Sequence, residues 1–184
     1  MTTEIVIDTC CLINLCAVGD LSEWLGGLDY QWYLPSPVQD EALYLHVARE
    51  DGGVEKTSVD LSEYVERGVL TDCRPQTAGE VARFVELARD LDDGEAMALA
   101  IAEARGWGFA TDDKKALGFA RRAGITLLTT PRILKEWEDS NSPTRHAVAQ
   151  ALQRIERTAC YSPPKNCPLS GWWRERIGDA TEGG

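Results

Sequence analysis

The chain has 184 residues, a length that suits one domain with a sizeable core or one domain plus a small extension. Hydrophobic residues make up 43% of it and charged residues 27%, as in ordinary soluble proteins, and no apolar run approaches the length of a membrane helix. A formal net charge of −11 argues against a protein that holds nucleic acid on an extended basic surface, whereas it suits an acidic metal-binding cleft or a basic protein partner.

The predicted elements begin with a strand, because residues 5–7 are three consecutive β-branched residues of the kind found in strands buried on both faces. Apolar residues at helical spacing predict a helix at 38–49. Thr77 and Glu80 have the spacing of a capping box. In chain order, the elements expected up to residue 130 are a strand at 5–7, helices at 9–18 and 21–25, a loop to residue 33, a helix at 38–49, a helical segment at 61–67, a strand at 68–73, helices at 77–89 and 96–105, a strand at 107–111, a helix at 114–123 and a strand at 125–129.

Up to residue 130 the expected strands alternate with helices, which predicts a parallel sheet with helices on both faces. The C-terminal part departs from this alternation. Helices are expected at 133–139 and 142–157, the second beginning with Ser142 and Pro143 as N-cap and first helical residue. The rest is expected to be an irregular tail, with Trp172 and Trp173 packing on the domain or on a partner. The predicted organisation is an α/β domain at 1–130, and at 131–184 a helical extension and irregular tail packing on the same domain.

The cysteines indicate the compartment. Six cysteines form no C-x-x-C motif, and two histidines are too few for a Cys/His zinc site. The N-terminus has no basic segment, and Glu4 and Asp8 interrupt its apolar run, so no signal peptide is expected. We therefore expect mostly reduced cysteines, with Cys160 and Cys167 as a weak candidate pair, and a cytoplasmic protein without membrane contact.

Acidic residues recur where a predicted strand ends or a predicted helix begins. They are Asp8 after the first strand, Asp112 and Asp113 after the strand at 107–111, Asp40 and Glu41 early in the helix at 38–49, and Asp92, Asp93 and Glu95 at the start of the helix at 96–105. Taken singly, each is explained as a helix cap or as a favourable charge at a helix N-terminus. Because the carboxyl ends of parallel strands share one edge of the sheet, the set is expected to converge there.

Convergence of these acids predicts a metal site. Clustered carboxylates repel one another unless cations lie between them. With no His or Cys expected nearby, oxygen ligands select Mg²⁺ or Mn²⁺ over zinc. Such a site can orient a phosphodiester, generate a hydroxide and stabilise the leaving oxygen.

Four blocks of the sequence resemble the PIN-domain family of metal-dependent ribonucleases, which includes VapC-like and PilT N-terminus-like proteins. They are Ile5-Val6-Ile7-Asp8-Thr9, Asp40-Glu41-Ala42-Leu43, Leu91-Asp92-Asp93-Gly94-Glu95-Ala96 and Ala110-Thr111-Asp112-Asp113-Lys114. The Asp-Gly-Glu-Ala block followed by Thr-Asp-Asp is the more specific part of the likeness. The resemblance implies a three-layer α/β/α PIN-like fold with a central parallel sheet of four to five strands and a helical C-terminal extension.

The resemblance also implies site residues. The catalytic, metal-binding acids it implies are Asp8, Glu41, Glu95 and Asp112 or Asp113, with Asp93 a candidate for the same pocket and for the place of Glu95. Candidates for binding substrate are Thr9, Thr111, Lys114 and Lys115. The alternative for the threonines is a helix cap or a strand end, and for the lysines a solvated helix face.

Two classes of function follow from the resemblance. The first is a Mg²⁺- or Mn²⁺-dependent endoribonuclease that hydrolyses RNA phosphodiesters. A toxin role for it would imply a cognate antitoxin, and homodimers are common in the family. The second is a catalytically silent PIN-fold module that binds nucleic acid or protein. Metal-dependent turnover separates the two.

Overall fold

The computed structural model describes residues 2–36, 38, 43–48 and 53–179, which form two compact units. The first comprises Met1–Leu12, Asp29–Ala42 and Asp60–Thr130, and the second Ile13–Leu28, Leu43–Val59 and Pro131–Gly184. In the described part of the chain, no helix combines the length and the apolar composition needed to cross a membrane.

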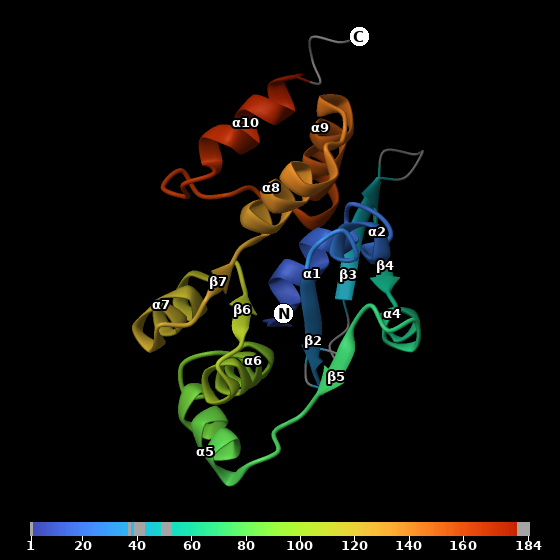
Figure 1. The fold of residues 1–184 in the computed structure, drawn as a ribbon. Helices are drawn as coiled ribbons and strands as arrows, with labels where there is room; N and C mark the ends of the chain where they lie inside the picture. Colours follow the sequence, from blue (N-terminus) through green and yellow to red (C-terminus); the bar gives the residue numbers. More distant parts are fainter. Residues whose placement is uncertain (1, 37, 39–42, 49–52, 180–184) are drawn as a thin grey trace. The chain divides into compact units, whose positions relative to one another are not determined.

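The first unit contains a five-stranded parallel sheet (Figure 1). Its order is β5 (Thr71–Cys73), β2 (Tyr30–Pro35), β1 (Thr3–Ile7), β6 (Gly108–Ala110) and β7 (Leu127–Leu128). The apolar run of β1 is fully buried, as its position in the middle of the sheet requires. Helices flank the sheet, and the predicted three-layer α/β/α fold with a central parallel sheet is confirmed.

Four helices of the first unit follow in sequence order: α4 (Ser62–Glu66), α5 (Ala78–Leu87), α6 (Asp93–Arg105) and α7 (Lys114–Ala123). The alanine-rich α6 packs between α5 and α7, and Leu99 lies in one apolar core with Val6 of β1 and Phe109 of β6. Gly106 ends α6 at φ 68° and Gly124 ends α7 at φ 70°, the left-handed conformation that glycine adopts most easily after a helix. Each glycine thus ends its helix shortly before the chain enters the next strand, β6 or β7.

The second unit is made of helices and a hairpin. Its elements are most of α1 (Thr9–Cys16), α2 (Leu21–Leu25), the antiparallel pair β3 (Leu43–Ala48) and β4 (Val54–Val59), α8 (Thr130–Asn141) after its first residue, α9 (Arg145–Arg154), the π-helix Ile155–Ala159 and α10 (Ser170–Asp179). Trp24 of α2 packs against Trp137 of α8, with ring centroids 4.0 Å apart and the ring planes tilted by 38°. The predicted boundary at residue 130 stays a prediction.

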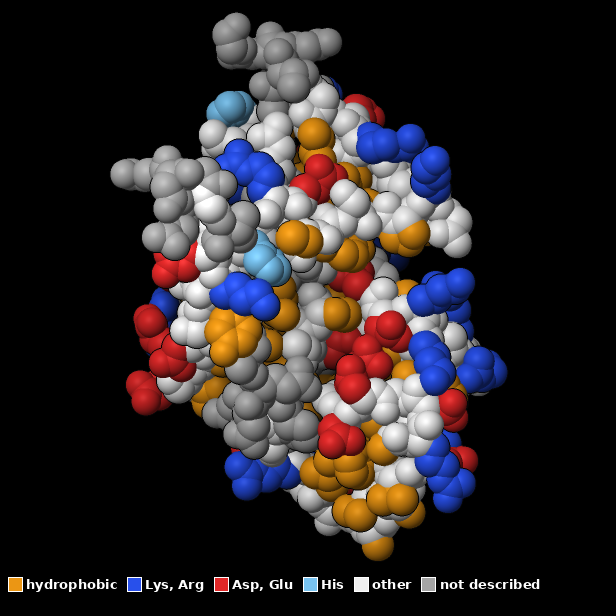
Figure 2. Space-filling model, turned by 180° about the vertical axis from the view of Figure 1, so that it is seen from behind, with side chains coloured by type: hydrophobic (Ala, Val, Ile, Leu, Met, Phe, Trp, Pro, Cys, Tyr) orange, Lys and Arg blue, Asp and Glu red, His pale blue; other side chains and the backbone are white. Residues whose placement is uncertain are grey.

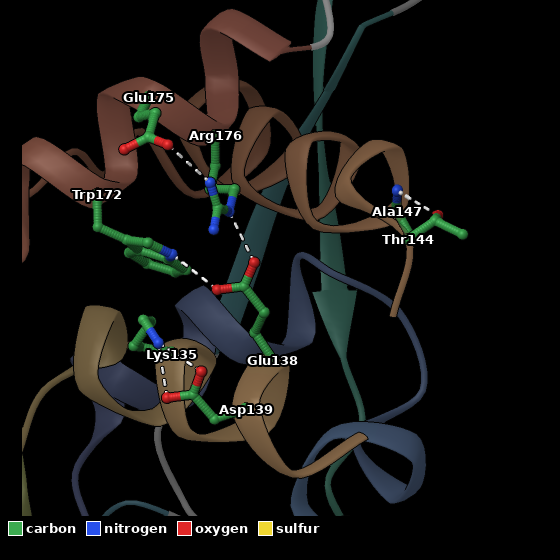
Figure 3. A network of polar contacts seen from close by, with 8 residues as sticks. All are labelled: Lys135, Glu138, Asp139, Thr144, Ala147, Trp172, Glu175 and Arg176. Carbon is green, nitrogen blue, oxygen red and sulfur yellow. Dashed lines mark hydrogen bonds and ion pairs between the residues drawn. The ribbon is translucent and has the colours of Figure 1, made fainter. Parts of the chain in front are cut away.

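Ion pairing fastens α10 to α8 within this second unit. Glu138 accepts hydrogen bonds from Trp172 Nε1 at 2.8 Å and from Arg176 Nε at 2.6 Å (Figure 3). Trp173 is 1% exposed, and its Nε1 donates to Glu156 at 2.9 Å. The tryptophans of the C-terminal segment are therefore packed, as their composition predicts.

Three sequence-based predictions of local structure are wrong. Residues 43–48, expected in a helix at 38–49, form strand β3, because each of them pairs with a residue of β4 in an antiparallel ladder that a helix cannot form. The expected loop before residue 33 contains most of β2, whose aromatic-rich run pairs with β1. The tail expected to be irregular contains α10, which its packing on α9 stabilises.

One helix start also differs from the prediction. Ser142, the expected N-cap, has a positive φ of 48°. Thr144 caps α9 instead, its hydroxyl accepting from Ala147 N at 3.2 Å (Figure 3). Threonine is a good N-cap too, and Pro143 remains outside the helix.

Candidate metal-binding site

The adjacent strands β1 and β6 bring Asp8 and Asp112 to the same edge of the sheet. Asp8 follows β1 directly, and its backbone N donates to Ala110 O of β6 at 3.0 Å. Asp112 lies two residues beyond the end of β6. Two loops that follow parallel neighbours must leave on the same edge, so the predicted convergence of these two acids is a consequence of the strand order.

Asp8 is a fully buried carboxylate held by weak and neutral donors. Its Oδ1 accepts from Cys11 N at 3.0 Å and from the Cys10 thiol at 3.0 Å, and Thr111 also hydrogen-bonds its side chain. Burial raises the pKa of Asp8 to about 7, and the nearby charge of Asp112 adds to the increase. Among the described residues, no lysine or arginine forms an ion pair with Asp8. The carboxylate therefore lacks the cation that would stabilise its charge.

The Asp112 carboxylate is held by its own set of hydrogen-bond donors. Its Oδ1 accepts from Thr130 N at 3.1 Å, and its Oδ2 accepts from the Thr130 hydroxyl and from the Cys11 thiol, the latter at 3.3 Å. The backbone N of Asp112 in turn donates to Cys10 Sγ at 3.1 Å. These contacts join the Asp112 side chain to the surroundings of Asp8.

Asp113 has a different set of contacts. Its Oδ1 accepts from Lys115 N at 2.7 Å and from Ala116 N at 2.8 Å, and so it caps α7. Its charge still acts on Glu95. The sequence left open which of the two adjacent aspartates belongs to the site. Asp112 is the one that contacts Cys10 and Cys11, the residues whose thiol and backbone N–H donate to Asp8.

Glu95 lies in the first turn of α6, and the charges of the neighbouring acids affect its pKa. Burial raises its pKa to about 7, and the charges of Asp92, Asp113 and Asp8 contribute further. Asp92 is the N-cap of α6, accepting from Glu95 N at 2.8 Å. The side chain of Asp93 is exposed. The charge of Asp8 therefore acts on Glu95, whereas Asp93 is exposed to solvent.

The other predicted site residues have mixed placements. Glu41 lies outside the described residues. Thr9 is the first residue of α1, and Thr111 is buried against Asp8 while also accepting from Asp113 N at 3.1 Å. Lys114 is exposed, whereas the Lys115 ammonium forms an ion pair with Asp90 at 3.3 Å. The structure therefore leaves Lys114 more available to a substrate than Lys115.

The sequence analysis missed three residues of this pocket: Cys10, Cys11 and Thr130. The expectation that no cysteine lies near the acids is wrong. Cys10 and Cys11 lie in the first turn of α1, directly after β1 and Asp8 in the chain, and ligand atoms of Asp8, Cys10 and Cys11 lie within 4.8 Å of one another. Thr130 follows β7 and begins α8, the same strand-to-helix signal that identified Asp8.

The donor set fits a divalent cation. Burial and the repulsion of neighbouring carboxylates raise the pKa values of Asp8 and Glu95, and a bound cation would offset both effects by stabilising the charged forms. Figure 2 shows acidic side chains gathered on one face of the molecule. Carboxylate oxygens are the ligands that Mg²⁺ and Mn²⁺ prefer, whereas thiols favour softer ions.

Similarity to known proteins is found with a family model and with a solved structure. A family model described as PIN domain (DUF3368) matches residues 4–168. Among solved structures, the chain is similar to a PilT N-terminus domain protein from the hyperthermophilic archaeon Sulfolobus solfataricus P2, at 19% sequence identity and a TM-score of 0.45. That similarity covers 73% of this chain and 93% of the other. A search of curated proteins finds no match.

Proposed function

Because this chain belongs to the PIN-domain family, we propose that it is a metal-dependent ribonuclease that hydrolyses RNA phosphodiesters. One arrangement carries the proposal: the adjacent strands β1 and β6 bring Asp8 and Asp112 to one edge of the sheet, and Glu95 in the first turn of α6 feels the charge of Asp8. Asp8 and Glu95 both have a pKa raised to about 7, and neither pairs with a lysine or arginine in the described part of the chain. Perturbed carboxylates of this kind are typical of functional sites.

The metal would be held by Asp8, Glu95 and Asp112, with Glu41 as the fourth acid implied by the family's sequence pattern. A bound Mg²⁺ or Mn²⁺ supplies positive charge for the phosphate and lowers the pKa of water. Cys11 N and Thr111 orient the Asp8 carboxylate, and Thr130 orients that of Asp112. Such preorganisation reduces the rearrangement needed when the charge of the phosphate develops.

RNA would be held beside these acids. Lys114 directly follows Asp113 and is exposed, so its ammonium can bind a phosphate of the strand. Thr9, at the start of α1, offers a hydroxyl at the same edge of the sheet. Phosphate contacts of this kind position the substrate without reading its sequence.

A cleavage assay tests the proposal. The full chain is incubated with a single-stranded and a hairpin RNA, with Mn²⁺, with Mg²⁺ and with a chelator. We expect cleavage that requires the metal and that Asp8→Asn, Glu95→Gln and Asp112→Asn each reduce at least about a hundredfold. Asp93→Asn is the matched control, because Asp93 lies in the same helical turn as Glu95 but is exposed.

Two outcomes contradict the proposal. Undiminished cleavage by purified Asp8→Asn would assign the activity to another site or to a contaminant. Absence of cleavage, together with absence of a Mn²⁺-dependent thermal shift, would favour the silent module that binds nucleic acid or protein without cutting it.

Partners form a further part of the proposal. A net charge of −11 and an acidic site suit a basic antitoxin segment that covers the acids, and a second copy of the chain is the other proposed partner. Co-expression with the neighbouring reading frame tests the first, because an antitoxin would co-purify and suppress cleavage. Light scattering of the purified chain tests the second.

A further inference from the structure

Two thiols line the acidic pocket, and they change which cations it can accept. Cys10 Sγ lies 3.0 Å from Asp8 Oδ1 and 3.2 Å from Asp8 Oδ2. Cys11 Sγ lies 3.3 Å from Asp112 Oδ2. Each thiol thus donates to a different carboxylate, and the two residues are adjacent in the chain.

We propose that Asp8, Cys10 and Cys11 form a binding site for a thiophilic divalent cation of the Zn²⁺ class, which competes with Mg²⁺ or Mn²⁺ for Asp8. Their ligand atoms already lie within 4.8 Å of one another. The inference concerns the same pocket as the proposed ribonuclease site, but it does not require that the protein cleave RNA.

The geometry suits such an ion. Zn–S and Zn–O bonds of a tetrahedral site place sulfur and oxygen ligands roughly 3.5 Å apart. The Cys10–Asp8 contact at 3.0 Å would have to lengthen by only a few tenths of an ångström. The cation takes the place of the thiol hydrogens, which are released to solvent as the sulfurs bind as thiolates.

The pocket also holds groups that orient the ligands. Asp112 Oδ2 lies 3.3 Å from Cys11 Sγ but outside the group formed by Asp8, Cys10 and Cys11, which leaves the fourth place to water. Cys11 N holds Asp8 Oδ1, and Asp112 N holds Cys10 Sγ, so backbone groups fix two of the donors. Outer contacts that orient ligands in this way raise metal affinity.

Selectivity follows from the ligand types. Mg²⁺ and Mn²⁺ gain little from sulfur, whereas Zn²⁺ and Cd²⁺ bind thiolates strongly. A thiophilic ion on Asp8, Cys10 and Cys11 removes Asp8 from the proposed hard-metal site. We therefore expect low concentrations of such an ion to inhibit whatever Mg²⁺- or Mn²⁺-dependent activity the chain has.

The test uses Cd²⁺ alone as the probe, because its bonds to thiolates absorb in the ultraviolet. The metal-free, reduced full chain is titrated with Cd²⁺, and the sulfur-to-cadmium absorption is recorded. The matched control is Cys160→Ser/Cys167→Ser, which removes the other two cysteines that are not buried. We expect this control to retain the absorption and Cys10→Ser/Cys11→Ser to lose it.

Two further measurements keep the test decisive if the double variant folds poorly. Cys10→Ser alone changes a partly exposed thiol and should reduce both the absorption and the Cd²⁺ affinity, the latter at least about tenfold. Asp8→Asn should lower the Cd²⁺ affinity while leaving both thiols in place. Circular dichroism of each variant verifies that it is folded.

Equal absorption in the wild type and in folded Cys10→Ser/Cys11→Ser overturns the inference, as does the absence of any absorption in the wild type. Neither result bears on RNA cleavage. Conversely, a chain that binds Cd²⁺ through these thiols and cleaves no RNA refutes the proposed ribonuclease function and leaves the inference standing.

Discussion

Two buried carboxylates of the first unit, Asp8 and Glu80, have opposite surroundings. Glu80 is 2% exposed and accepts from Arg105 Nε at 2.7 Å and from Thr77 N at 2.9 Å. The hydrogen bond from Arg105 is the main reason why the pKa of Glu80 is lowered to about 2. Asp8 is 0% exposed, is held by thiols, a hydroxyl and a backbone N–H, and has a pKa raised to about 7.

The difference supports different roles for the two acids, a structural one for Glu80 and the proposed metal-binding one for Asp8. Glu80 has its cation within the protein and completes a capping box at the start of α5, so it stabilises the fold. Asp8 bears a burial cost that no described cation offsets, which is the expected condition of a residue that binds a cation from outside. Burial alone would not have distinguished the two.

The largest expected contrast is in RNA cleavage. Asp8→Asn should reduce Mn²⁺-dependent cleavage at least about a hundredfold, since it removes a charged ligand from the proposed metal site. Glu80→Gln should leave the rate per folded molecule within about twofold of wild type, because Glu80 belongs to the fold rather than to the site. Initial rates on a fluorescent RNA, corrected for the folded fraction, measure both. A hundredfold loss in Glu80→Gln would remove the contrast.

The second contrast is in stability, with the opposite order. Glu80→Gln leaves Arg105, whose side chain is 15% exposed, without its carboxylate, and should lower the free energy of unfolding by roughly 2–4 kcal/mol. Asp8→Asn should raise it by about 1–3 kcal/mol above pH 7 in metal-free buffer, because a buried charge is removed. Urea unfolding monitored by tryptophan fluorescence measures these changes.

A matched control accompanies the stability experiment. Glu86 pairs with Arg83 through a side chain that is 64% exposed, so Glu86→Gln should change the free energy of unfolding by less than about 0.5 kcal/mol. A loss as large as that of Glu80→Gln would show that burial of the Glu80 pair is not the cause.

The third contrast is in the pH dependence of stability without metal. The folded-state pKa of Asp8, about 7, lies above its ordinary value of 3.8, so the folded chain binds the extra proton and stability falls as pH rises through that interval. The folded-state pKa of Glu80, about 2, lies below 4.5, so its contribution is present above pH 4.5 and is lost as pH falls toward 2. Thermal unfolding from pH 2 to 9 measures both.

Each variant should remove one side of that profile. Asp8→Asn should flatten the decline between about pH 4 and 7, although Glu95, whose pKa is also raised to about 7, keeps part of it. Glu80→Gln should flatten the acid side instead. Identical profiles for the two variants would contradict the assigned charge states.

The smallest contrast tests a second structural acid, Glu138 in the second unit. Glu138→Gln weakens the contacts with Arg176 and Trp172 and should cost about 1–2 kcal/mol of unfolding free energy. Glu175→Gln is its matched control, because Glu175 pairs with the same arginine through a side chain that is 62% exposed, and this change should cost less than about 0.5 kcal/mol. Proteolysis near α10 provides a second measurement, since α10 should be released faster only in Glu138→Gln.

Much of the local structure could be predicted from the sequence. Capping residues and apolar periodicity predicted α5, α6 and α7, and three β-branched residues predicted β1. Strand β3 and helix α10 were not predicted, because the first depends on its ladder with β4 and the second on packing against α9. Short segments of this kind take the structure that their distant partners stabilise.

For the site, the sequence by itself determined that Asp8 and Asp112 follow strands and that Asp92 and Glu95 stand at the start of a helix, because capping and strand patterns are local. Only the tertiary structure distinguished Asp112, which contacts the Cys11 thiol beside Asp8, from Asp113, which caps α7. It also placed the thiols of Cys10 and Cys11 among the carboxylates and put Glu80, but not Asp8, beside an arginine. Charge state and ligand chemistry depend on what the fold brings within a few ångströms, and residues about 100 positions apart in the chain become neighbours only when the parallel sheet forms.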